Sequence, residues 1–217
     1  MAFGLGPWNF YEETNKLCLE AANLHNRLKP HIFSNAIRAH NSGFPYPLTP
    51  LPLAFSSDPN VYGLAASLQR SYQWMIGESL LAAPLYGDDY PTANSRDIYL
   101  PTGKWMDYDT GTLYEGSQTL RDFPIPIEKT PLFVGGSGFV VEQENDQLFG
   151  RLYPINSESH NSFIHEYGET ESKIHVDVNS WEDLSIIEES TGKKVDYHHV
   201  LHAYQFAIEP GENYQIR

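Results

Sequence analysis

The amino-acid sequence predicts an α+β fold in which helices come first and an antiparallel β-sandwich follows. Two observations indicate this order. In the first third of the chain apolar residues recur every three or four positions, which is the spacing of one helical face. After Gly77 the sequence breaks into short runs rich in β-branched and aromatic residues, separated by turn-forming pairs such as Thr110-Gly111. Because helices and strands are segregated, alternating βα units over the whole chain are not expected.

The first helical segment, a long helix or a pair of helices, is predicted over residues 11–41. Its apolar face consists of Leu17, Ala21, Leu24, Leu28 and Ile32. Pro30 removes a backbone N–H donor from the middle of the segment, so we expect a kink or a break near Leu28. The helix should end at residues 41–43, because Gly43 accepts the left-handed conformation that closes a helix.

Two features of this helix invite a functional interpretation. The only cysteine, Cys18, lies within the apolar pattern, so we expect a small core residue rather than a nucleophile or a ligand. A single cysteine excludes an intramolecular disulfide. The run Arg38-Ala39-His40-Asn41 is interpreted as a helix C-terminus, where cationic side chains favour the exposed carbonyl groups.

Two shorter segments lie between this helix and the β-rich part. Residues 48–55 are apolar but contain Pro50 and Pro52, each of which withholds a ladder N–H, so the pattern predicts only an extended segment. Asp58 and Pro59 have the form of a helix N-cap followed by proline at the first position. This start predicts a helix over residues 59–75 that buries Leu64, Leu68 and Tyr72.

The β-rich part contains many short predicted strands at close spacing, which is typical of a sandwich. The predicted strands cover residues 80–85, 96–100, 104–107, 112–115, 118–123, 132–133, 139–142, 150–153, 162–167, 173–178, 184–188, 194–195, 203–208 and 213–216. The strand at 80–85 should be buried on both faces, because its first four residues are all apolar. The polar stretch 142–147 is either a boundary between two β units or a hairpin loop.

Composition and charge exclude several classes of function. The chain has 217 residues, of which 41% are hydrophobic and 13% aromatic, so it is long and apolar enough to bury a sizeable core. Its formal net charge of −14 would repel nucleic-acid phosphates and anionic lipids. The first ten residues lack a basic start and an apolar run, so no export or membrane signal is expected.

Three kinds of residue group could carry chemistry: carboxylate pairs, clustered histidines and a glycine run. The adjacent pairs Glu12-Glu13, Asp88-Asp89, Glu182-Asp183 and Glu188-Glu189 diverge on a helix or a strand, so they are interpreted as solvated surface. His198, His199 and His202 are interpreted as exposed imidazoles of a loop, because no familiar ligand spacing accompanies them. Residues 135–138 read Gly-Gly-Ser-Gly and lack the lysine of a phosphate loop, so they predict a tight turn. No catalytic residue, no metal site and no cofactor is therefore assigned.

An ordered set of motifs resembles glycoside hydrolase family 31. In chain order the motifs are Gly6-Pro7-Trp8-Asn9-Phe10, residues 24–33 (LHNRLKPHIF), residues 50–55 (PLPLAF) with Asp58-Pro59, residues 73–85 (QWMIGESLLAAPL), residues 96–111 (RDIYLPTGKWMDYDTG) and residues 130–134 (TPLFV). The sequence departs from the family pattern at His31, Thr49, Met106 and Gly135, where tyrosine, arginine, an aromatic residue and arginine are usual. These departures leave the substrate subgroup open and do not alter the resemblance.

The resemblance implies the C-terminal part of a retaining α-glycosidase. Residues 1–78 would be the last helices and the eighth strand, 48–55, of a (β/α)8 catalytic barrel. Residues 79–143 would form a proximal C-terminal β-sandwich, and residues 144–217 further strands or a second small β module. The family works with two aspartates that lie upstream of the matched motifs, so no residue here is assigned as nucleophile or acid/base. The implied partners are a carbohydrate substrate and the missing N-terminal barrel portion.

Two other classes of function remain open. A carbohydrate-binding module would present tryptophan side chains on a β face, since sugar rings stack on indole, and Trp105 and Trp181 are the candidates. A purely structural piece is the third possibility. If the chain is a barrel remnant, Leu17, Leu24, Leu28 and Leu68 lack a complete core, and the isolated chain should self-associate or bind a hydrophobic dye. A variant beginning near Gly77 should then behave better.

Overall fold

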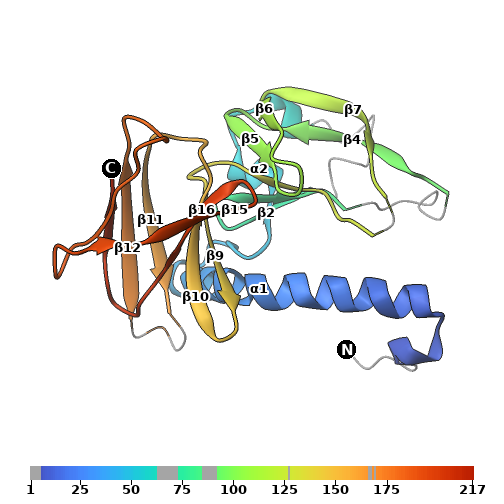
Figure 1. The fold of residues 1–217 in the computed structure, drawn as a ribbon. Helices are drawn as coiled ribbons and strands as arrows, with labels where there is room; N and C mark the ends of the chain where they lie inside the picture. The colour runs from blue at the N-terminus through green and yellow to red at the C-terminus, as the bar shows by residue number, and fades with distance from the viewer. Residues whose placement is uncertain (1–5, 63–72, 85–91, 127, 166–167, 169) are drawn as a thin grey trace.

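A computed structural model describes residues 6–62, 73–84, 92–126, 128–165, 168 and 170–217. Its sheets fall into two groups, and one long helix lies against both (Figure 1). The proximal sheets are built from residues 49–134 and the distal sheets from residues 139–217. A helical N-terminal part followed by mostly antiparallel sheets confirms the predicted fold class.

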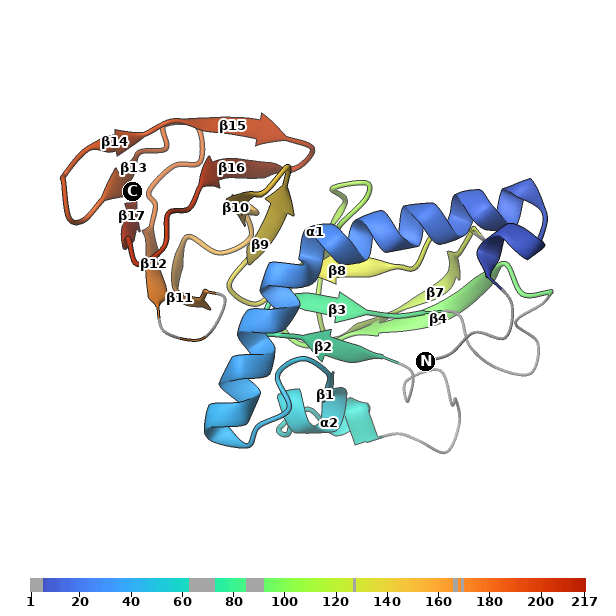
Figure 2. The same cartoon turned by 90° about the horizontal axis from the view of Figure 1, so that it is seen from below.

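The first predicted helix is a single element, α1 (Glu12–Ser42), preceded by the 3-10 turn η1 (Pro7–Asn9). Pro30 lies inside the helix without dividing it, and Figure 2 shows α1 changing direction part-way along its length. Gly43 closes the helix in the left-handed conformation (φ 77°) and donates its N–H to the Ala39 carbonyl at 2.8 Å. The predicted end and kink are thus present, whereas a break into two helices is not. Among the described residues, no helix has the length and apolarity needed to cross a membrane.

Only the second half of α1 is buried. Leu28 is buried, and the neighbouring Leu24 and Ile32 pack partly against the same core cluster. The expectation that Leu28 lacks a core is therefore wrong. Cys18, by contrast, is exposed, so its prediction as a core residue is also wrong. Cys18 lies in the first half of α1, and this half extends beyond the distal sheets (Figure 1).

The segment between α1 and the sheets differs most from its prediction. Within the strand expected over residues 48–55, only β1 (Thr49–Pro50) is a strand, and α2 (Leu51–Ala54) is a helix with proline in its first turn. Pro52 has no N–H for a sheet ladder but is tolerated at a helix start, which explains the change. The barrel-strand prediction is thus wrong for residues 51–54.

The next predicted helix begins where expected and ends differently. Asp58 caps its start by accepting the Asn60 N–H at 2.9 Å, and the turn η2 covers Pro59–Tyr62. Residues 63–72, with Leu64, Leu68 and Tyr72, lie outside the described residues. Residues 74–75, predicted as the helix end, belong to strand β2 (Trp74–Ile76). Here pairing with strands on both sides overrides the helical pattern.

The proximal sheets comprise one sheet of six strands and one of two. The six-stranded sheet has the order β1, β2, β3 (Leu80–Ala82), β8 (Leu132–Val134), β5 (Lys104–Asp107) and β6 (Leu113–Glu115). β4 (Ser95–Leu100) pairs with β7 (Gln118–Pro124). All of these pairs are antiparallel.

The six-stranded sheet is covered on both faces. Leu80 and Val134 face the cluster that receives Leu28 of α1. Leu81 and Phe133 face a second cluster, which includes side chains of the β4–β7 pair. Because successive strand residues point to opposite faces, this double cover explains why every residue of β3 and β8 is buried. The predicted two-sided burial of this strand is confirmed for Leu80–Ala82.

The distal sheets enclose a third core cluster. One sheet has the order β15 (Tyr197–Val200), β16 (Ala203–Ala207), β10 (Gln147–Leu152) and β9 (Phe139–Glu144). The other has the order β11 (Glu158–Ile164), β12 (Glu171–Asp177), β17 (Tyr214–Ile216), β13 (Ile186–Glu188) and β14 (Lys194–Val195). β17 lies at the centre of its sheet, parallel to β12 and antiparallel to β13.

The polar stretch 142–147 is a hairpin rather than a break. β9 and β10 pair antiparallel, with Glu144 opposite Gln147. The two residues between them, Asn145 and Asp146, both have positive φ, at 47° and 66°. Two positive values are the signature of a type I′ turn, whose twist matches the strands it joins. The hairpin thus runs across the position where a division at 143–144 was predicted.

Candidate functional site

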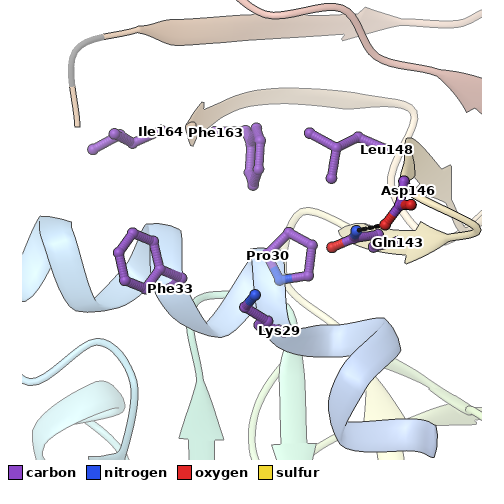
Figure 3. Close-up of a pocket in the computed structure, with 8 residues that line it drawn as sticks. All are labelled: Lys29, Pro30, Phe33, Gln143, Asp146, Leu148, Phe163 and Ile164. Atoms are coloured by element: carbon purple, nitrogen blue, oxygen red, sulfur yellow. Dashed lines mark hydrogen bonds between the residues drawn. The ribbon is translucent and has the colours of Figure 1, made fainter. Parts of the chain in front are cut away.

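A groove runs between α1 and the distal sheets. Its apolar end is a hollow of about 190 Å³ lined by Pro30 and Phe33 of α1, Leu148 of β10 and Phe163 and Ile164 of β11. Figure 3 shows the helix side chains on one side of this hollow and those of the strands on the other. The polar side chains that complete the lining are Lys29, Gln143 and Asp146.

The polar end of the groove is larger. A hollow of about 630 Å³ shares three lining residues with the apolar end, so the two are continuous. Its lining is Asn23, Asn26, Arg27 and Lys29 from α1 and Gln143, Glu144, Asn145 and Asp146 from the hairpin. The helix residues recur at intervals of three and four positions, which places them on one face of α1. We call the two hollows together the α1–hairpin groove.

The hairpin wall of the groove is held in place locally. The type I′ turn fixes the backbone at Asn145 and Asp146. Gln143 Nε2 donates to Asp146 Oδ1 at 3.4 Å, the contact drawn as a dashed line in Figure 3. The wall therefore presents amide and carboxylate groups from a defined backbone.

A buried charge network lies beside the groove. The Glu142 carboxylate is fully buried and forms ion pairs with Arg151 at 3.2 Å and Arg27 at 3.4 Å. Its other oxygen accepts a hydrogen bond of 2.6 Å from the Tyr108 hydroxyl, which in turn accepts one from Arg27 at 3.0 Å. Arg151 also binds Glu144 at 2.6 Å. We call Arg27, Tyr108, Glu142, Glu144 and Arg151 the buried network.

The network joins three parts of the molecule. Arg27 belongs to α1, Tyr108 follows β5 of the proximal sheet, and Glu142 and Arg151 belong to β9 and β10 of the distal sheet. Burial and then the Glu142 carboxylate raise the pKa of Tyr108, so the hydroxyl stays a donor. Burial opposes the charge on Arg27, but Tyr108 and Glu142 outweigh it and raise the pKa of the guanidinium. The Arg27 guanidinium therefore remains charged.

None of the three adjacent carboxylate pairs that the structure describes lines this groove. Glu12, Glu13, Glu182 and Asp183 are exposed, which agrees with their interpretation as solvated surface. In the pair Glu188-Glu189 the first residue is half-buried and the second is exposed. Asp88-Asp89 lies outside the described residues.

Two of the three clustered histidines are exposed as predicted, but both are on a strand. His198 and His199 lie in β15 rather than in a loop, with both side chains exposed. His202 is half-buried in the turn that follows, with a ring nitrogen 3.2 Å from the Asp109 carbonyl. In the part of the chain that the structure describes, no group of three or more histidine, cysteine, aspartate or glutamate side chains is arranged to hold a metal ion.

The glycine run forms the predicted turn, and residues 38–41 lie at the end of α1 as predicted. Residues 135–138 form a turn between β8 and β9, closed by the Gly138 N–H, which donates to the Gly135 carbonyl at 2.9 Å. Arg38 stands in the last turns of α1, lies 4.0 Å from the centre of the Tyr46 ring and pairs with Glu78 at 3.1 Å. Both features connect elements of the fold.

The two candidate tryptophans have different surroundings. Trp105 is buried in the proximal core and donates its indole N–H to the Pro101 carbonyl at 2.8 Å, so its prediction as a sugar-stacking residue is wrong. Trp181 is half-buried and stacks on Tyr204 with ring centres 5.8 Å apart.

The sequence did not predict the α1–hairpin groove, because its two walls are more than 100 residues apart in sequence.

Comparison with known families gives a match over the middle of the chain. The glycosyl hydrolase family 31 C-terminal domain matches residues 45–138, which include every strand of the proximal sheets. The chain carries the glycosyl hydrolase family 31 C-terminal domain. The family resemblance read from the sequence motifs is thereby confirmed, and relatives in this family are glycoside hydrolases.

Curated relatives of this family 31 domain are much longer than the chain. A 1,6-alpha-glucosyltransferase of Sporosarcina globispora is 32% identical over 147 residues, which are 67% of this chain and 11% of that protein. Alpha-glucosidase 2 of Bacillus thermoamyloliquefaciens is 29% identical over 128 residues, 59% of this chain and 15% of that protein. The chain thus spans less than a fifth of the length of these relatives.

A solved family 31 structure has the same fold over nearly the whole chain. The dextranase of Flavobacterium johnsoniae, solved with glucose, superimposes with a TM-score of 0.73 at 18% identity. The superposition covers 94% of this chain and 32% of the dextranase. The similarity extends beyond residues 45–138, so α1 and the distal sheets also have counterparts in that structure.

Proposed function

We propose that this chain is the C-terminal part of a retaining α-glycosidase that hydrolyses terminal α-linked sugars from oligo- or polysaccharides. Retaining hydrolysis requires two carboxyl groups about 5 to 5.5 Å apart, one as nucleophile and one as acid/base. In the proposal, residues outside this sequence supply both. The chain contributes the end of the catalytic barrel and the β-sandwich that supports it.

The buried network is the observation that carries this proposal. A supporting domain must hold the barrel helix at a fixed position relative to the sheets. Arg27 of α1 reaches Glu142 and Tyr108, so one cluster ties the helix to both sheet groups. Buried ion pairs add little net stability compared with apolar packing, but they tolerate few alternative geometries. Their contribution here is to fix the angle between α1 and the sheets.

Further contacts along α1 support the same role. Ser34 Oγ accepts the Ile164 N–H of β11 at 2.9 Å, and His31 Nε2 lies 3.3 Å from the Ile76 carbonyl of β2. At Gly77 (φ 66°) a Cβ atom would approach Asn35 Nδ2 to 2.7 Å, so the side chains of α1 lie directly against this turn. The second half of α1 is thereby fixed against both groups of sheets.

Exposed apolar residues around α2 offer a contact surface for the rest of the barrel. Leu48, Leu53 and Tyr62 are large hydrophobic residues that stay exposed around α2. Among the described residues β1 is an edge strand of its sheet, paired with β2, and an edge strand can accept a further strand. In the proposal, the N-terminal barrel strands cover these groups.

The names of the relatives suggest the class of substrate. The relatives include an alpha-glucosidase and a 1,6-alpha-glucosyltransferase, and the Flavobacterium dextranase is also solved, as a variant, with isomaltotriose. We propose α-linked glucose oligosaccharides for the complete enzyme. As parts of that enzyme we propose residues 1–78, 79–143 and 144–217, with the β9–β10 hairpin joining the last two.

Two activity measurements test the proposal. The purified 217-residue chain should not turn over an aryl α-glucoside, and turnover that a substitution within the chain abolishes would overturn the proposal. In a chimera, residues 7–217 replace the matching C-terminal region of the Bacillus alpha-glucosidase. The chimera should hydrolyse the same substrate, and Glu142→Gln should lower both its rate and its melting temperature. The exposed Glu158→Gln is the matched control. A folded but inactive chimera would contradict the supporting role.

A further inference from the structure

The geometry points to a second function: we propose that the α1–hairpin groove binds a neutral oligosaccharide. One sugar ring would lie in the apolar hollow beside Phe33, and the next would extend into the polar hollow. The inference takes its ligand class from the proposed function, but its evidence is the groove itself.

The apolar hollow matches one side of a sugar ring. A pyranose presents C–H groups on its faces and hydroxyl groups around its rim. Phe33 is 42% exposed although it is a large aromatic residue, and it lines the hollow together with Pro30 and Leu148. Small-molecule sites characteristically combine such apolar walls with a few convergent polar groups. Here Lys29, Gln143 and Asp146 stand at the rim (Figure 3).

The polar hollow suits hydroxyl groups. Asn23, Asn26, Asn145 and Gln143 carry amides, and each amide both donates and accepts hydrogen bonds. A sugar hydroxyl has the same dual capacity, so neighbouring amides can pair with it in either direction. An amide-rich lining therefore favours a polyhydroxylated ligand over a purely apolar one.

The charges of the groove favour a neutral ligand. Two cationic side chains, Arg27 and Lys29, face two anionic ones, Glu144 and Asp146. Arg27 and Glu144 are each paired with a member of the buried network, at 3.4 Å and 2.6 Å. A phosphate would meet the two carboxylates, and a cationic ligand would meet the lysine. The balance selects against both.

The groove is also formed in advance of binding. The type I′ turn fixes the hairpin wall, and the buried network fixes the helix wall through Arg27. Binding then orders few protein groups, which lowers its entropic cost. A shallow site with few anchors still binds weakly, so we expect a Kd of about 1 mM for a trisaccharide.

Ligand-observed NMR on the 217-residue chain tests the inference. Isomaltotriose and maltotriose are titrated, with glycerol as the non-sugar comparator, and we expect saturable binding of at least one trisaccharide. Phe33→Ala should weaken binding about fivefold or more, and Gln143→Ala about threefold. The matched controls are Phe10→Ala, another exposed phenylalanine, and Gln118→Ala, an exposed glutamine of β7. Neither control should change the Kd.

Each outcome has a defined meaning. Phe33 and Gln143 lie at the surface, and equal melting temperatures would show that their variants fold. Absence of saturable binding, or equal affinity in both groove variants and the parent, would overturn the inference. Equal weakening by the controls would do the same, because the groove would then have no special part. Binding is measured without catalysis, so this result is independent of the activity of the chimera.

Discussion

The two halves of α1 have the same helical character but opposite surroundings. Leu28 and His31, in the second half, are buried against the sheets, whereas Leu19 and Cys18, in the first half, are exposed. Figure 2 shows the helix bending between these two stretches. Apolar periodicity therefore defines which face of a helix is suited for burial, but it does not show that the partner lies in the same chain.

The largest loss of stability is expected in the six-stranded sheet, which packs against the second half of α1. Leu81 of β3 is fully buried, so Leu81→Asp places an unpaired charge in the proximal core and should destabilise by about 5 kcal/mol. Leu113→Asp, at a half-exposed position on edge strand β6, is the control and should cost less than about 1 kcal/mol. Urea unfolding measures both. An unchanged midpoint for Leu81→Asp would mean that β3 is exposed in solution.

The network that anchors the helix should give the next largest effect. Glu142→Gln keeps the shape of the side chain but leaves Arg27 and Arg151 without their shared carboxylate, so we expect a loss of about 4 kcal/mol. Glu158→Gln, exposed on β11, should change the free energy of unfolding by less than about 0.5 kcal/mol. Equal stability of the two variants would show that the network is not formed in solution.

The halves of α1 are compared directly by a pair of alanine substitutions. Leu28→Ala removes a buried side chain and should cost about 3 kcal/mol. Leu19→Ala removes a side chain that is 61% exposed and should cost less than about 0.5 kcal/mol. Denaturant unfolding of both variants gives the difference, and similar losses would mean that the first half is also packed.

His31, in the buried second half of α1, should make the free energy of unfolding depend on pH. Burial, and also the nearby Arg38, lower the pKa of His31 to about 4, below the usual value of about 6.5. Between these values the unfolded chain binds a proton and the folded chain does not. Stability should therefore fall by about 2 kcal/mol from pH 7 to pH 5 through this residue alone. His31→Gln should remove that component of the slope, and an identical slope in the variant would contradict the assignment.

The smallest effect on stability is expected for substitutions of the exposed apolar side chains. Leu48 and Leu53 are 56% and 48% exposed, so the isolated chain should bind a hydrophobic dye or self-associate. The double variant Leu48→Ser/Leu53→Ser should bind less dye with little change in stability. A monomeric, dye-free parent chain would show that these residues form no interaction surface. The sequence predicts that a variant beginning near Gly77 self-associates less than the full chain. The structure reverses this expectation, because such a variant lacks Leu28 and Arg27 and should self-associate more.

Much of the fold was predictable from local patterns. The strands at 104–107 and 194–195 match their predictions because turn residues bound short runs suited to strands. β2 was missed because its residues continue a helical spacing, and only pairing with β1 and β3 makes them a strand. β15 was missed because His198 and His199 break the apolar pattern at a sheet edge.

The candidate site was much less predictable. Trp105 reads as a surface aromatic but is covered by the proximal sheets, and its burial depends on strands distant in sequence. Phe33 belongs to α1, and nothing in the residues around it shows that a hairpin more than 100 residues later faces it. A groove between distant elements leaves no periodic signal in either of them.

The central position of β17 has a consequence for the order of folding. β11–β12 and β13–β14 each form hairpins, and in the described part of their sheet residues 214–216 join one hairpin to the other. During vectorial synthesis both hairpins are made before the strand that links them, and the contact with β12 spans about 40 residues. Such non-local closure is slow compared with hairpin formation. We therefore expect the five-stranded sheet to be the last part to become protected from hydrogen exchange during refolding.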